Sequence, residues 1–175
     1  TLELGGKSPQ IVFADADLDA ALPFLVNAGI QNAGQTCSAG SRILVERSRF
    51  DEVVERLAQR VRALRVGPAL ADLDLGPLIS RRQHEIVSHY LALARDSGLP
   101  VAAQGEIVRD APAGGWYVRP TLVAGVRSHP EWSRTLFPER YRPKPTVIVQ
   151  RTEPQPIRFD GVMNWPLAAV TETTR

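Results

Sequence analysis

The first 126 residues alternate between short apolar runs and longer segments with helical periodicity, and this alternation is the strongest constraint on the fold. The run at 10–13 suits a buried strand, and the run at 41–46 also has the length of a strand. Each precedes a segment whose pattern favours a helix, at 18–33 and 49–65. Apolar residues of the second helix recur at helical spacing until Gly67 stops the pattern. Strands that alternate with long helices predict an α/β fold, with an open, largely parallel, twisted sheet flanked by helices.

Two of the expected helices carry features that affect their ends. Pro23 lies inside the segment 18–33, where proline removes a backbone donor and clashes with the preceding turn, so we expect a bend or a displaced start. A further helix is expected to begin at Ser80, whose side chain can cap the N-terminus while Gln83 reaches back, and to continue to Gly98.

The chain changes character beyond Val126. Further strands are expected before that point, at 100–103, 116–119 and 121–126. Seven of the 14 prolines fall in the last 49 residues, which excludes a long unbroken helix and predicts extended or irregular structure there. Residues 1–126 are therefore expected to form the core of the domain, and 127–175 its irregular, proline-rich continuation.

The composition is that of a soluble globular chain, with 43% hydrophobic and 23% charged residues among 175. A single cysteine excludes an intramolecular disulfide framework and makes the cytoplasm the default compartment. Basic and acidic residues are interspersed despite a net charge of +2, which argues against a nucleic-acid partner. No apolar run is long enough to span a membrane, and no glycine-rich phosphate loop of the dinucleotide-binding kind occurs.

Cys37 and Glu3 form the first candidate catalytic pair. A thiolate is a strong nucleophile, and it needs a base to form it or to activate the water that later releases a bound product. Glu3, 34 positions before Cys37, can be that base. Gly34 and Gly40 flank the cysteine, and they allow a tight turn that brings peptide N–H groups near the group under attack.

Other roles for these residues stay open at this point. A lone cysteine can be a small buried hydrophobe, and a thiol–imidazole dyad with His84, His89 or His129 is possible. His84 and His89 are five apart on an expected helix and so lie on different faces, which argues against a joint metal site, and we expect no metal. Arg42 can stabilise a thiolate or begin a strand, and we prefer the second interpretation.

Four motifs occur in the order and spacing of a known family. They are Glu-Leu-Gly-Gly-Lys-Ser-Pro at 3–9, Gly-Gln-Thr-Cys-Ser-Ala-Gly-Ser-Arg at 34–42, Gly-Pro-Leu-Ile at 76–79 and Gly-Trp-Tyr-Val-Arg-Pro-Thr-Leu at 115–122. With them the chain resembles the catalytic domain of the NAD(P)-dependent aldehyde dehydrogenase superfamily, from Thr1 to about Val126.

This resemblance implies a mechanism and its cofactor. Cys37 would attack an aldehyde to give a thiohemiacetal, hydride would pass to NAD or NADP, and Glu3 would activate the water that hydrolyses the thioester. The Cys37 amide would donate one hydrogen bond to the oxyanion, and an asparagine upstream of this segment would donate the second. The product is a carboxylic acid, and the resemblance implies a small aldehyde as substrate and a homo-oligomer as the intact enzyme.

The tail departs from the family pattern. The segment at 138–143 is the counterpart of an acidic motif, in which Glu139 would bind the nicotinamide ribose, but Arg142 replaces a glycine, and Pro166 also stands where glycine is usual. A glycine that needs positive φ cannot become proline, whose φ is fixed near −65°. Two explanations stay open: a diverged or decaying gene, and local reading-frame errors.

The family's nucleotide-binding domain lies before the Glu3 motif, where this chain starts. We therefore expect the isolated chain neither to bind NAD tightly nor to oxidise aldehydes, and to self-associate through uncovered apolar surface. The alternative from another class is a non-catalytic remnant or interaction module without cofactor.

Overall fold

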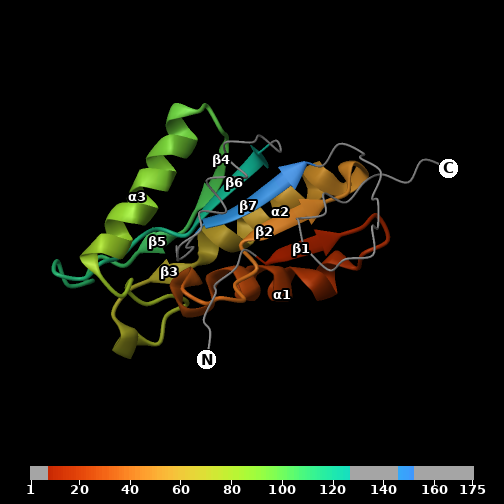
Figure 1. The fold of residues 1–175 in the computed structure, drawn as a ribbon. Coiled ribbons are helices and arrows are strands. Elements are labelled where there is room, and N and C mark those ends of the chain that lie inside the picture. Colours follow the sequence, from red (N-terminus) through yellow and green to blue (C-terminus); the bar gives the residue numbers. More distant parts are fainter. Residues whose placement is uncertain (1–7, 127–145, 152–175) are drawn as a thin grey trace, which may run out of the picture.

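The computed structural model of the chain describes residues 8–126 and 146–151, with side chains for 8–125. Five strands form the main sheet, in the order β1 (Pro9–Val12), β2 (Arg42–Val45), β7 (Thr146–Arg151), β6 (Thr121–Val126) and β4 (Val101–Gln104). The first four strands in this order run parallel to one another, and β4 pairs antiparallel with β6 (Figure 1). This arrangement confirms the α/β fold with an open, largely parallel sheet.

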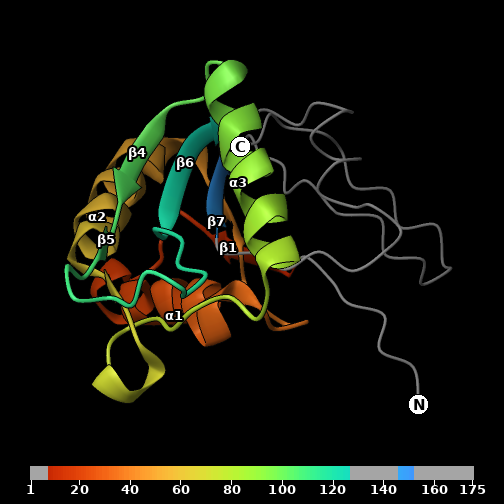
Figure 2. The ribbon, with the colours of Figure 1, turned by 90° about the vertical axis from the view of Figure 1, so that its left-hand side faces the viewer.

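Three α-helices flank the sheet: α1 (Leu18–Ile30), α2 (Phe50–Ala63) and α3 (Arg81–Asp96). Figure 2 shows α2 and α3 on opposite sides of β6 and β7. Three short 3-10 helices lie in the connections: η1 (Gln31–Gly34), η2 (Arg47–Arg49) and η3 (Ala69–Ala71). All three expected helices are present, although the first ends three residues early and passes into η1.

The start of α1 is set by its cap and not by its proline. Asp17 Oδ1 accepts hydrogen bonds from the backbone N–H groups of Asp19 at 3.0 Å and Ala20 at 3.2 Å, so the helix begins at Leu18. Pro23 lies inside the helix, and the expectation of a displaced start is wrong.

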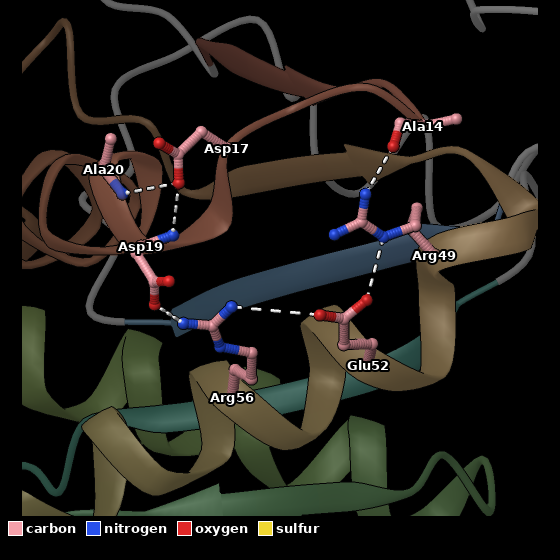
Figure 3. A network of polar contacts seen from close by, with 7 residues as sticks. All are labelled: Ala14, Asp17, Asp19, Ala20, Arg49, Glu52 and Arg56. Carbon is pink, nitrogen blue, oxygen red and sulfur yellow. Dashed lines mark hydrogen bonds and ion pairs between the residues drawn. The ribbon is translucent and has the colours of Figure 1, made fainter.

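A polar network fastens the beginning of α1 to α2 (Figure 3). The Arg56 guanidinium forms an ion pair with Asp19 across the two helices. Its Nη1 also lies 3.8 Å from Glu52 Oε1. Arg49 donates to Glu52 at 2.8 Å and also to the carbonyl oxygen of Ala14. These residues are partly or largely exposed, so the network contributes orientation more than stability.

The core cluster draws on the helices and the sheet, and α2 shows its pattern most clearly. Val53, Leu57 and Val61 are four residues apart and at most 3% exposed, so they form one apolar stripe of α2. They pack in one cluster with Ile43 of β2 and Leu122 of β6, both fully buried. The amphipathic helix inferred from the sequence is confirmed.

Helix α2 ends at Ala63, before Gly67. Leu64, the residue after the helix, has an extended backbone with ψ 133°. Arg65 then begins a small parallel sheet of β3 (Arg65–Val66) and β5 (Glu106–Ile107). Asp74 Oδ2 accepts the Arg65 N–H at 2.7 Å. The expected strand at 116–119 is wrong, because the structure shows irregular backbone there whose Trp116 carbonyl accepts the N–H of Leu78 at 2.8 Å.

The structure refines two expectations about strands. Extended or irregular structure was expected beyond Val126, and β7 is extended there as a central strand, in which Ile148 pairs with both Arg42 of β2 and Val123 of β6. The rest of the 127–175 continuation lies outside the described residues. The run at 10–13 was expected to be buried, but Ile11 is 44% exposed, because β1 pairs only with β2 among the described strands.

The cap of α3 follows the sequence in part. Ser80 Oγ accepts the N–H of Gln83 at 3.2 Å, as expected for a capping residue. The Gln83 side chain is 6% exposed, and its Nε2 has no hydrogen-bond partner among the described residues. Gly98, with φ 67°, follows the end of the helix.

Candidate functional site

Cys37 lies in the loop that joins η1 to β2, between the expected helix at 18–33 and the expected strand at 41–46, as these two predictions imply. Its thiol is free and exposed, so the interpretation as a small buried hydrophobe is wrong. The loop leads directly into Arg42, the first residue of β2. The nucleophile candidate therefore sits on irregular backbone that is held at both ends by regular elements.

The chain reverses just before Cys37 through three consecutive residues with positive φ. Asn32 and Ala33 have φ 50° and 53°, and Gly34 has φ 75°. This left-handed conformation is natural for glycine but costs an alanine about 1–2 kcal/mol. The tight turn expected at Gly34 is present.

Gly40 lies close to the side chain of Gln10. A Cβ at this position would lie 2.8 Å from the Gln10 carboxamide, so a larger residue would displace that side chain. The Gln10 Nε2 donates to the carbonyl oxygens of Gly40 at 2.7 Å and Leu25 at 2.9 Å. Gln10 of β1 therefore joins the loop to α1, a role that sequence reasoning missed.

Backbone bonds close the loop over the end of α1. The Gly40 N–H donates to the Ala28 carbonyl at 2.8 Å, which satisfies a C-terminal carbonyl of the helix. The Ala39 N–H donates to the Thr36 carbonyl at 3.1 Å, across the position of Cys37. Ala39 is fully buried and Cys37 is exposed, so the loop presents the thiol outward.

Gln35 is a second residue that sequence reasoning missed. Its side chain accepts the N–H of Ile79 at 2.9 Å and donates to the Asn32 carbonyl at 3.1 Å. Its place in the motif, two residues before Cys37, was a signal, but the partner 44 positions away was not visible in the sequence.

Arg42 begins β2, which confirms the preferred interpretation of this residue. Arg42 is only 4% exposed, and burial lowers the pKa of its guanidinium from the ordinary value to about 10, because burial disfavours the charged form.

The other candidate residues fall into two groups: those outside the described residues, and the two histidines of α3, which make ring contacts with aromatic residues. Glu3, Glu139 and His129 lie outside the described residues. The ring of His84 lies 5.9 Å from that of Trp116, and the ring of His89 lies 5.7 Å from that of Tyr90. Within 8–126 and 146–151, no group of three or more His, Cys, Asp or Glu residues could hold a metal ion.

A search of the described helices for a membrane span finds none of sufficient length and apolarity.

Comparison with known proteins finds a family match over most of the chain. The family model described as "Aldehyde dehydrogenase family" matches residues 1–136. The candidate aldehyde dehydrogenase DhaS of Bacillus subtilis is 37% identical over 171 residues, which are 97% of this chain and 33% of that protein.

Solved structures agree with these matches. The crystal structure of a candidate aldehyde dehydrogenase from Burkholderia cenocepacia has a TM-score of 0.79 and 54% identity, and covers 86% of this chain and 31% of its own. Betaine aldehyde dehydrogenase from Staphylococcus aureus, in complex with NAD+, has a TM-score of 0.71 and 34% identity, with 86% and 29% covered. The chain thus spans about a third of the length of these relatives. The family model, these relatives and the shared fold together show that the chain belongs to the aldehyde dehydrogenase family.

Proposed function

We propose that this chain carries the nucleophile of an enzyme that oxidises an aldehyde to a carboxylic acid with NAD(P). The observation that supports it most is the exposed, free thiol of Cys37 on a constrained turn, within the motif that resembles the family's nucleophile motif. An exposed thiol held by a rigid loop is accessible to a carbonyl carbon, which a buried structural cysteine is not.

In the proposed reaction, the Cys37 sulfur forms a bond to the aldehyde carbon, and the carbonyl oxygen takes the negative charge. Backbone N–H groups in the loop can stabilise that oxyanion. Bound NAD(P) would supply the chemistry of hydride acceptance, which leaves the acyl group on Cys37 as a thioester. Glu3 then removes a proton from water, the hydroxyl adds to the acyl carbon, and the thiolate leaves with release of the acid.

The described residues do not by themselves supply the donors of a dinucleotide site. Glu139, the one residue with a proposed ribose contact, lies outside them, and the sequence has no glycine-rich phosphate loop. NAD+ is bound by the Staphylococcus aureus relative, and this supports the same cofactor for the enzyme of which this chain is the nucleophile-bearing part. The isolated chain is proposed to be inactive.

The assignment of partners and compartment rests on the same resemblance. We assign a small-molecule aldehyde as substrate, a cytoplasmic location and a homo-oligomeric intact enzyme. Large apolar side chains that are at least 74% exposed support self-association of the chain: Phe24, Leu70 and Ile79.

The test compares this chain with the same chain joined to its flanking coding sequence, using propanal, NAD+ and NADH absorbance. We expect turnover only in the longer protein and none in its Cys37→Ala variant. Glu3→Gln should release one equivalent of NADH in a burst and then turn over roughly 10²–10⁴-fold more slowly, because the acyl group waits for an activated water. Turnover that survives in Cys37→Ala would remove Cys37 from the mechanism, and a normal rate in Glu3→Gln would remove the base.

A further inference from the structure

Both polar atoms of the Gln35 carboxamide form hydrogen bonds. Oε1 accepts the backbone N–H of Ile79 at 2.9 Å, and Nε2 donates to the carbonyl oxygen of Asn32 at 3.1 Å. A side chain that only capped the local turn would need the second bond alone. The first bond reaches a segment 44 positions away in the sequence.

The Asn32 end of this link lies within the left-handed turn. Asn32 O accepts two hydrogen bonds, from the Gln35 N–H at 3.0 Å and from Gln35 Nε2. Asn32 and the following Ala33 both have positive φ, a conformation that persists only where surrounding contacts over-determine it. Gln35 therefore supplies two of the contacts that fix the backbone immediately before Cys37.

The Ile79 end lies on a segment that is itself anchored. The preceding Leu78 donates its N–H to Trp116 O at 2.8 Å, and the following Ser80 caps α3. The Ile79 side chain is 84% exposed, so the backbone and not side-chain packing makes the contact with Gln35. This bond therefore connects the turn before Cys37 to the start of α3, a 16-residue helix.

We propose that Gln35 is a positioning residue for Cys37, which couples the orientation of the thiol to the segment that leads into α3. The inference deepens the proposed function and rests on it, because orientation matters only if the thiol attacks a carbonyl. Nucleophilic addition needs a defined approach of sulfur to carbon and a nearby N–H for the developing oxyanion, whereas alkylation of an exposed thiol needs only access.

Two substitutions at position 35 separate the two hydrogen bonds of the Gln35 side chain, and a third substitution, in α2, is their control. Gln35→Leu removes both bonds. Gln35→Glu keeps an acceptor for Ile79 but loses the donor to Asn32 O. Gln59→Leu is the matched control, since Gln59 is an exposed glutamine of α2 whose Nε2 bonds only locally, to Glu55 at 3.2 Å.

A second pair of variants approaches the link from its far end. Ile79→Pro removes the N–H that Gln35 accepts, while Ile79→Ala keeps it and removes only an exposed side chain. If the coupling is real, Ile79→Pro changes the environment of Cys37, which is 42 positions away, and Ile79→Ala does not.

The readouts use the fact that Cys37 is the single cysteine of the 175 residues. Bromotrifluoroacetone attached to Cys37 gives one fluorine NMR signal that reports the order of the loop. Amide exchange at Ile79 reports the hydrogen bond that its N–H donates to Gln35 Oε1. Carbon-13-labelled propanal reports thiohemiacetal formation, in which S–H adds across C=O without oxidation. The alkylation rate measures access alone.

For Gln35→Leu we expect faster exchange of the Ile79 amide by about fivefold, as for loss of one hydrogen bond, and a shifted or broadened fluorine signal. Propanal addition should weaken by a similar factor, while the alkylation rate stays within about twofold. Gln35→Glu should restore protection at Ile79 but not the fluorine signal. Ile79→Pro should reproduce the fluorine change, and the two control variants should match the original chain.

An unchanged fluorine signal in both Gln35→Leu and Ile79→Pro would overturn the proposal, as would equal losses in propanal addition and alkylation. Failure of the proposed function looks different. If Cys37 is not a nucleophile for aldehydes, the original chain forms no more thiohemiacetal than a free thiol such as glutathione, while exchange at Ile79 still responds to Gln35.

Discussion

Helix α2 and the loop at 31–41 lie in the same domain but are specified in different ways. Helix α2 is regular, and its apolar stripe at Val53, Leu57 and Val61 is buried against the sheet. The loop has three successive residues with positive φ and is held by bonds from Gln10 and Gln35. The helix is stabilised by area removed from water, and the loop by the pairing of individual polar groups.

This difference separates stability from chemistry. A buried stripe tolerates many apolar side chains of similar volume, since the driving force is not directional. A turn that presents a thiol depends on which donor meets which acceptor, since hydrogen bonds are directional. Substitutions in α2 should therefore change how much of the protein is folded, and substitutions in the loop should change what the folded protein can do.

The largest effect is expected from Leu57→Ala, which removes a side chain that is 1% exposed. The cavity should lower the free energy of unfolding by about 2–5 kcal/mol, measured by urea denaturation. Leu70→Ala is the control, because Leu70 is fully exposed and its loss should change stability by less than about 0.5 kcal/mol. A changed alkylation rate of Cys37 per folded molecule in Leu57→Ala would break the separation between the two regions.

An intermediate effect is expected when an alanine is replaced by glycine in α2 and, in a separate variant, in the loop. Ala58→Gly in α2 should cost about 1–2 kcal/mol, from helix propensity and a lost buried methyl group. Ala33→Gly relieves a φ of 53°, a gain of about 1–2 kcal/mol that offsets its own lost methyl group. The two variants should therefore differ by about 2 kcal/mol in the free energy of unfolding. Equal destabilisation would mean that the turn is not strained.

The smallest effect is expected from Arg56→Met in the network of Figure 3, which joins α1 to α2 through Asp19. The pair is partly exposed, so the loss of stability should be below about 1 kcal/mol and should shrink further as salt is added. Asp19→Asn should give the same result from the other partner. A salt-independent loss in either variant would show that packing of the arginine stem, and not charge, joins the helices.

Much of the fold was predictable because local patterns carried it. The stripe of α2, the cap at Ser80 and the apolar run of β2 each lie within a few consecutive residues. The elements that the sequence did not predict have a common cause, which is pairing with strands far away in the sequence. The two-residue strand β3 is too short to show a pattern, and it exists because it pairs with β5 about 40 residues later.

The central strand β7 shows the same limit. Its sequence follows prolines at 143 and 145, which favour irregular structure in any local interpretation. It becomes a strand because it lies between β2 and β6 and pairs with both of them, one along each edge (Figure 1).

The candidate site divides in the same way. The sequence alone determined the family through its motifs, the loop position of Cys37, and the strand that begins at Arg42, because these depend on residue type and short spacing. Only the tertiary structure decided that Gln10 and Gln35 hold the loop, and that Gly40 lies against the Gln10 side chain. The physical reason is that a hydrogen bond or a close contact between distant segments exists only once the chain has folded around it.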